Sequence, residues 1–357
     1  MGQKVFSFRC FCLYGIFLFL FVCLIHGRGY AQNIRALPFK GKETKEMASL
    51  LYNEAQVKVA DVLPGGLEVE KLLTFFSETS WKGGCQGLSF DIVQNPNRIA
   101  FDENWEFVVQ RGGKYLSNNP NLRKILKKIR HWSDSHPGHH VITIHINLKQ
   151  NSTFGDDRVF CEKIDQILAE ELSSDRIYRP AFLLRDASNL LEGVKKYGWP
   201  SLEDLRGNFI VVLSGDDSKR LVSRRRMVYT YMEPYKRLAF VDVDQEVAER
   251  YIKEYKGIKN FYYQEGARVF LNIKYGLSDW EKFSKQASQE GFITRVWKVD
   301  SQREWNLVKE AGVNLIATNK VYKSRWASLF TPSTEEEKTK VGLREEERAL
   351  DGTASPL

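Results

Sequence analysis

Three polar residues alternate along one β-rich run of the sequence and could do chemistry together. His145, Asn147 and Lys149 occupy every second position of the run that begins at Val141, and side chains two residues apart in a strand point to the same side. An imidazole transfers protons near neutral pH, and an ammonium group binds phosphate as a point charge. The pattern also fits an interior histidine that is hydrogen-bonded to its neighbours, which we expect for His145. Lys149 could equally form a salt bridge to Asp91.

Short β-rich runs that alternate with helical patterns must position these residues. Helical spacing of Leu122, Ile125, Leu126 and Ile129 illustrates the intervening helices, and 244–255 and 278–289 also read as helices. This alternation predicts an α/β fold, a (β/α)8 TIM barrel, with a doubly wound open sheet as the alternative. In a barrel the chemistry belongs at the carboxyl ends of the strands. The eight candidate strands are Gln56–Asp61, Gly87–Val93, Glu106–Gln110, Val141–Leu148, Asn208–Leu213, Leu238–Asp242, Phe292–Trp297 and Val313–Ala317.

The amino terminus is typical of a cleaved secretory signal. An uncharged apolar stretch of 16 residues, from Cys10 to Ile25, follows two basic residues and precedes small residues at Gly29 and Ala31. We therefore predict a signal peptide over residues 1–31 and a secreted or periplasmic protein. The alternative is an uncleaved membrane anchor, although about 20 residues are needed to span a bilayer.

Only Cys85 and Cys161 remain after such a leader is removed. In an oxidising compartment they could form one disulfide, and two free buried thiols are the alternative. The segment Asn151–Thr153 fits a glycosylation acceptor if the source makes such glycans.

The composition of the rest of the chain indicates its domain organisation and limits the kinds of partner that it can bind. We predict a single domain over residues 32–330 and a charged, flexible tail over 331–357, where two triplets of glutamate occur. Without the leader the chain carries 50 bases and 45 acids, hence a net charge of +5. This mild excess argues against a nucleic-acid binder, whereas it suits contact with an anionic membrane surface. The oligomeric state stays open.

Three stretches of the sequence resemble the calcium-dependent phosphoinositide phospholipase C-like family, a branch of the TIM-barrel phosphodiesterases. They are 129–149, which contains an Arg-His-Trp and a His-Pro-Gly-His segment, 198–213, which runs from Gly-Trp-Pro to Arg-Gly and into a strand, and 291–319. The resemblance covers roughly 53–322. It implies cleavage of a phosphodiester by the substrate's own neighbouring hydroxyl, with two histidines as general base and acid and a Ca²⁺ ion that stabilises the developing charge.

The sequence departs from this family at the residues that would do the chemistry. Asp61 occupies the position of the first histidine, and Val62 that of a metal-binding asparagine. Gln110 stands where the resemblance implies the second histidine, and an amide cannot act as a general acid. Ser89 and Asn147 each replace an acid of the family's metal site, whereas Asp91 and Lys149 are retained. His145 could substitute for a lost proton-transfer group.

Counting oxygen atoms limits the metal site that the resemblance implies. Ser89, Asp91, Asn147 and Asp61 offer four side-chain ligands at best, whereas Ca²⁺ takes six to eight oxygens. We therefore expect any calcium binding to be weak.

The sequence supports three hypotheses about function. We expect a phosphodiesterase-like barrel that has lost most of its ancestral reaction but still binds a phosphorylated small molecule or phospholipid head group through Lys149, Arg111 and Arg295. The first alternative is a divergent, active, metal-dependent phosphodiesterase that uses Asp61, Asp91 and His145. The second is a non-catalytic scaffold whose outer helices bind another protein. We interpret the run Arg224–Arg226 as a solvated loop.

Overall fold

The computed structural model describes residues 50–61, 69–73, 85–94, 107–110, 120–149, 156–233, 235–244, 247–248, 267–321 and 326. All of them belong to one compact unit, Ala36–Leu357. Among these described residues, no helix combines the length and the apolar character that crossing a membrane requires. The predicted leader, the predicted tail, Arg111 and Asn151 lie outside the described residues.

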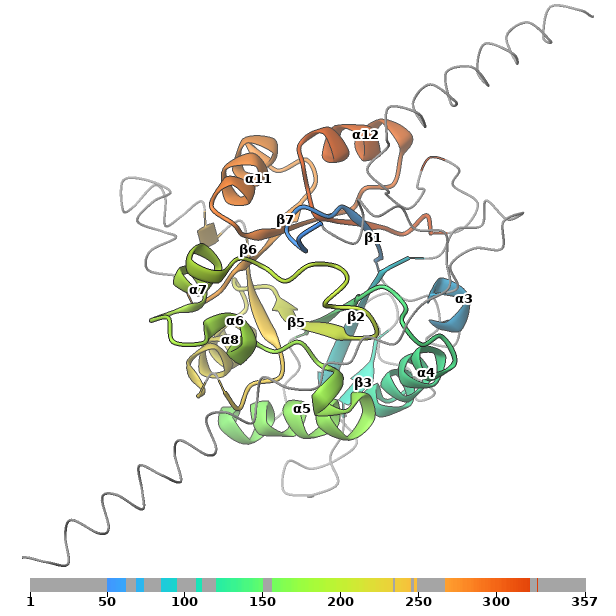
Figure 1. The fold of residues 1–357 in the computed structure, drawn as a ribbon, viewed down its shortest axis with the longest axis vertical. Coiled ribbons are helices and arrows are strands. Elements are labelled where there is room, and N and C mark those ends of the chain that lie inside the picture. The colour runs from blue at the N-terminus through green and yellow to red at the C-terminus, as the bar shows by residue number, and fades with distance from the viewer. Residues whose placement is uncertain are drawn as a thin grey trace, which may run out of the picture. The chain divides into compact units, whose positions relative to one another are not determined.

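Eight parallel strands close into a barrel, as predicted (Figure 1). The first strand pairs with both the second and the last, which closes the sheet. The barrel strands are β1 (Val57–Ala60), β2 (Gly87–Gln94), β4 (Ile142–Leu148), β5 (Phe209–Gly215), β6 (Phe240–Asp244), β7 (Phe270–Lys274), β8 (Ile293–Trp297) and β9 (Leu315–Thr318).

One predicted barrel strand is wrong, and another was missed. The segment Phe107–Val109 forms β3, which pairs antiparallel with β2 and lies outside the parallel set. The eighth barrel strand is instead β7, which pairs with β6 and β8. The apolar run Phe107–Val109 looks like a buried strand, whereas asparagine and lysine interrupt the apolar run of β7. The apolar pattern alone therefore did not show which of the two is a barrel strand.

Helices surround the strands in Figure 1. Their apolar positions pack on the outward-facing residues of the strands, for example Leu122, Ile125 and Ile129 of α4 in one cluster with Ile144 and Ile146 of β4. The described helices are α3 (Val69–Leu73), α4 (Leu122–Ser135), α5 (Asp157–Leu172), η1 (Ser174–Arg176), α6 (Pro180–Leu184), α7 (Leu190–Tyr197), α8 (Arg220–Tyr231), α11 (Trp280–Gln289) and α12 (Gln302–Glu310).

An aromatic cluster fills the amino-terminal end of the barrel. The Trp199 ring, from the Gly-Trp-Pro segment, lies 5.7 Å from the Phe270 ring and 5.5 Å from the Tyr52 ring. The Trp199 indole donates to the Gly291 carbonyl at 2.9 Å. This segment therefore closes the barrel opposite the carboxyl ends of the strands, where it stabilises the fold.

Both described cysteines are free and buried. The Cys85 thiol donates to the Leu72 carbonyl at 3.3 Å, and the Cys161 thiol to the Arg225 carbonyl at 3.5 Å. The sequence allowed either a disulfide or two free buried thiols, and the structure contains two free buried thiols.

Candidate functional site

Polar side chains in or directly after seven strands meet at the carboxyl end of the barrel. On β2 and β4 the apolar residues pack under the helices, so the alternate residues point into the barrel. Gly87 is one of these inward positions, because a Cβ there would lie 2.7 Å from Val59 Cγ2. Nine residues, which we call the mouth residues, form two hydrogen-bonded groups: Asp91, Asn147 and Lys149 in one, and Asp61, Ser89, Ser214, Asp242, Asn272 and Arg295 in the other.

Arg295 of β8 lies at the centre of the mouth. Its Nη2 donates to Asp61 Oδ1 at 2.8 Å and to Ser89 Oγ at 3.2 Å, and its Nη1 donates to Asn272 Oδ1 at 2.7 Å. The residue is only 5% exposed. Arg295 was predicted to bind phosphate, and the structure does place it in the mouth. Its guanidinium, however, already binds side chains from three other strands.

Asp91 binds the second cation of the mouth, the ammonium group of Lys149. Lys149 Nζ lies 3.3 Å from Asp91 Oδ1, and Asn147 Nδ2 donates to the same oxygen at 2.7 Å. The salt bridge that the sequence left open for Lys149 is therefore present. Because the Lys149 side chain is 37% exposed, its ammonium group can still meet a ligand that enters from solvent.

Ser214, Asp242 and Asn272 are mouth residues that the sequence analysis missed. Asn272 Nδ2 donates to Ser214 Oγ at 3.2 Å, and the Ser214 hydroxyl donates to the Asp242 carboxylate. Burial raises the pKa of Asp242, an effect that the Arg226 guanidinium opposes. The inward parity of Asp242, two residues after the core residue Phe240, was the signal that could have found it.

The interpretation of Arg224–Arg226 as a solvated loop is wrong. All three residues lie on α8, and Arg225 and Arg226 are 4% and 0% exposed. Arg226 pairs with the carboxylates of Asp242 and Asp217 and donates to the Gly215 carbonyl at 2.9 Å. The buried arginine therefore crosses from α8 to β6 and fixes the Asp242 side chain from below.

Gln110 lies beside Asp91 through its backbone. The Gln110 amide donates to the Asp91 carbonyl at 2.8 Å, directly after the antiparallel strand β3. Gln110 is half-buried. It therefore follows a strand that the barrel does not contain, rather than ending a barrel strand as predicted.

His145 is an interior residue, as predicted, but the hydrogen bonds expected for it are absent. It is 1% exposed, and neither ring nitrogen has a hydrogen-bond partner among the described residues. Burial and the nearby Arg295 guanidinium lower the pKa of His145 well below its usual value. The imidazole is therefore neutral and lies one layer beneath the mouth.

The other described histidines lie in and after α4, at the end of the barrel away from the mouth. His139 Nδ1 lies 2.5 Å from the His140 carbonyl, so Nδ1 carries the proton and Nε2 can accept from Ser133 Oγ at 2.6 Å. Burial lowers the pKa of His139 to about 4. These histidines belong to the fold rather than to the mouth.

The oxygen atoms of the mouth do not fit a calcium site as they are arranged. Asp61 and Ser89 accept from Arg295, and Asp91 accepts from Lys149 and Asn147. Nowhere in the described part of the chain do three or more acidic, histidine or cysteine side chains converge as metal ligands. The predicted ligands Ser89, Asp91 and Asn147 are therefore neighbours whose polar atoms bind protein groups.

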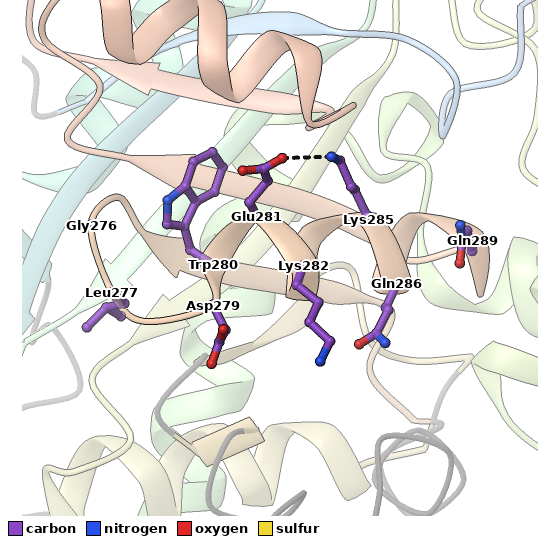
Figure 2. Close-up of a pocket in the computed structure, with 9 residues that line it drawn as sticks. All are labelled: Gly276, Leu277, Asp279, Trp280, Glu281, Lys282, Lys285, Gln286 and Gln289. Carbon is purple, nitrogen blue, oxygen red and sulfur yellow. Dashed lines mark hydrogen bonds and ion pairs between the residues drawn. The ribbon is translucent and has the colours of Figure 1, made fainter.

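A separate hollow of about 620 Å³ lies along α11 and the turn that precedes it (Figure 2). Gly276, Trp280, Lys282 and Gln289 are among its lining residues, and no mouth residue contributes to it. Figure 2 shows that two lining residues, Glu281 and Lys285, pair with each other, at 2.7 Å. Because none of the nine mouth residues lines it, this hollow is not the candidate site.

The barrel has the same fold as solved phospholipases C. A calcium-dependent phosphoinositol-specific phospholipase C from a Pseudomonas species, described as a myo-inositol complex, is 19% identical, with a TM-score of 0.59 over 81% of this chain and 95% of that one. A Ca²⁺-dependent phosphatidylinositol-specific phospholipase C from Streptomyces antibioticus is 16% identical, with a TM-score of 0.53 over 76% and 95% of the two chains. At these identities the likeness concerns the fold.

One region of the sequence also matches a family model. Residues 113–256 match the family model described as phosphoinositide phospholipase C, Ca²⁺-dependent. No curated protein matches the sequence. The matched region contains β4, β5 and α8, and thus Asn147, Lys149 and Arg226. This region of the chain therefore resembles the calcium-dependent phosphoinositide phospholipases C, and the barrel has the fold of the solved phospholipases of this type.

Proposed function

We propose that this protein is a secreted or periplasmic phospholipase C-like barrel that has lost most of its ancestral reaction and binds a phosphorylated ligand at its mouth. The observation that carries the proposal is the Asp61–Arg295 ion pair. It occupies the position at which the resemblance implies the first proton-transferring histidine. The Asp61 oxygen that would accept a substrate's proton already accepts a hydrogen bond from the Arg295 guanidinium.

The other proton-transfer positions support the same conclusion. Cleavage by a neighbouring hydroxyl needs one group that accepts a proton and one that donates it. The amide of Gln110 does neither. His145 is 1% exposed and neutral, which leaves it without access to a substrate in solvent. The alternative of an active enzyme that uses Asp61, Asp91 and His145 would need all three to rearrange.

Lys149 is the residue that we expect to meet the phosphate. Its ammonium group lies at the rim of the mouth, 37% exposed, and only one mouth carboxylate pairs with it. Phosphate carries more charge than that carboxylate and can share the ammonium group with it. An inositol phosphate or phospholipid head group therefore suits the mouth, and the mild positive charge of the mature chain suits an anionic membrane surface.

Thermal unfolding of the purified mature chain in the presence of inositol 1-phosphate tests the binding. The experiment includes a chelator, with myo-inositol as the ligand without phosphate. We expect inositol 1-phosphate to raise the unfolding midpoint of the wild type, because a ligand that binds the folded state stabilises it. The increase should be lost in Lys149→Met and retained in Lys298→Met, which removes an exposed lysine outside the mouth. No shift in the wild type would favour the scaffold alternative.

A further inference from the structure

The charge balance of the mouth is at odds with a calcium site. Of the three mouth carboxylates, Asp61 contacts Arg295 and Asp91 contacts Lys149, whereas Asp242 pairs with Arg226. A calcium ion would have to share these carboxylates with cations that are already bound. Hard oxygen ligands attract Ca²⁺ by their negative charge, and an adjacent fixed cation cancels that attraction.

Of the two cationic side chains, Arg295 is better placed than Lys149 to take the role of a metal ion. Its side chain is 6% exposed, and it contacts Asp61 directly after β1, Ser89 of β2 and Asn272 of β7. A guanidinium presents several donors in a fixed plane, which lets one side chain join several strands. Arg295 thus connects oxygen atoms of different strands, as a bound metal ion would.

Hydrogen-bond acceptors surround the Arg295 guanidinium. The Asp61 carboxylate contacts it, Ser89 and Asn272 accept from it, and the nearby His145 is neutral. Asp242 is a further carboxylate whose charge interacts with the guanidinium. No second cation among the described residues contacts Asp61, Ser89 or Asn272 in place of Arg295.

Asn147 supports the same conclusion at Asp91. A carboxylate oxygen only accepts hydrogen bonds, so the Asn147 atom that lies 2.7 Å from it is the amide nitrogen. The amide therefore presents its donor to the carboxylate oxygen at which a metal would bind. With Lys149 at 3.3 Å from the same oxygen, Asp91 Oδ1 has two donors of its own.

We infer that Arg295 and Lys149 replace the divalent cation, so that the mouth holds two cationic side chains of its own and works without calcium. This inference deepens the proposed function, since the internal cations would attract the phosphate in place of the metal. Its test measures calcium binding alone and does not depend on whether a phosphorylated ligand binds. A failure of this inference can therefore be distinguished from a failure of the proposed ligand binding.

The experiment compares thermal unfolding of the mature chain in a chelator, in Ca²⁺ and in Mg²⁺. About 10 mM Ca²⁺ is roughly ten times the weak end of protein calcium affinities, and binding at that level should raise the unfolding midpoint by about 2 °C. We expect no calcium-specific shift in the wild type. Lys149→Met and Arg295→Met each free one mouth carboxylate, and we expect a calcium-specific increase of this size in at least one of them.

Lys298→Met is the matched control, because it removes an exposed lysine without freeing a mouth carboxylate. It should behave as the wild type does. If Arg295→Met does not fold, Lys149→Met decides the question alone, since its side chain is partly in solvent. A calcium-specific increase in the wild type would overturn the inference. It would also be overturned if every folded variant remained insensitive to calcium.

Discussion

Asp61 and Arg295 form an ion pair between residues that are 234 positions apart in the sequence. Their side chains are 11% and 6% exposed. The sequence predicted that both belong to the site, because both occur in or directly after a predicted strand. It could not predict that they bind each other, since that depends on how the barrel closes around them. At this scale, residue types indicate which chemistry is available, and tertiary contacts decide whether it is used.

Removal of either partner of this pair should destabilise the protein strongly. Asp61→Asn or Arg295→Met leaves a buried charge without its partner, which costs about 3–5 kcal/mol in comparable cases. The double variant should lose less than the sum of the two single losses. Urea unfolding of the wild type and the three variants measures the coupling. Additive losses would show that the pair contributes nothing of its own.

His139 should make stability depend on pH. Its pKa is about 4 in the folded protein, against an ordinary value near 6.5, so the unfolded chain binds the proton more readily. Stability is therefore retained above pH 6.5 and falls as the pH decreases toward 4, by about 3 kcal/mol in total from this residue.

The variant His139→Asn isolates that contribution, because its amide cannot be protonated and can still donate to the His140 carbonyl. The difference in unfolding free energy between wild type and variant should change by about 3 kcal/mol between pH 7 and pH 4. A constant difference across this range would contradict the burial argument for His139.

Among the elements, α8 differs most from the sequence prediction. Three consecutive arginines usually indicate solvent, and the alternation of Asp242 within β6 was the available contrary signal. The structure buries Arg226 because two acids, Asp217 and Asp242, lie within reach of it. Charge composition does not reveal such pairing when the partners come from other elements.

The three arginines of α8 should differ sharply on substitution. Arg226→Met leaves Asp242 and Asp217 buried without their shared cation and should cost about 3–5 kcal/mol. Arg224→Met is the matched control, because the Arg224 side chain is 56% exposed and its ion pair with Asp157 should contribute about 0–1 kcal/mol. Denaturant unfolding measures both. Equal losses would show that the buried network of α8 and β6 is not a stabilising unit.

The strands show how much of the barrel the apolar pattern of the sequence predicts. Seven of the eight predicted runs became barrel strands, because apolar residues alternate with inward polar residues or fill both faces. The exception, 106–110, contains the short antiparallel strand β3. β7 was missed because Asn272 and Lys274 interrupt its apolar pattern. Those two residues are polar because their positions point toward the mouth, so function obscured the strand signal.

For the whole molecule, the family match and the local chemistry lead to different expectations. The family model that matches residues 113–256 describes a calcium-dependent phospholipase C. The described mouth, in contrast, contains an arginine that is bound to several strands, and the imidazole of His145 beneath it is buried and neutral. The Gly-Trp-Pro segment that carried much of the resemblance packs at the opposite end of the barrel. This segment therefore stabilises the fold and takes no part in the mouth.

The most direct test of this account is the rate at which the mature chain releases inositol phosphate from phosphatidylinositol vesicles, with Ca²⁺ or with a chelator. Loss of both proton-transfer groups predicts turnover at least about 10⁴-fold below a typical enzyme rate of about 10 s⁻¹, with no stimulation by calcium. Calcium-stimulated turnover near ordinary rates that Asp91→Ala abolishes would contradict the account.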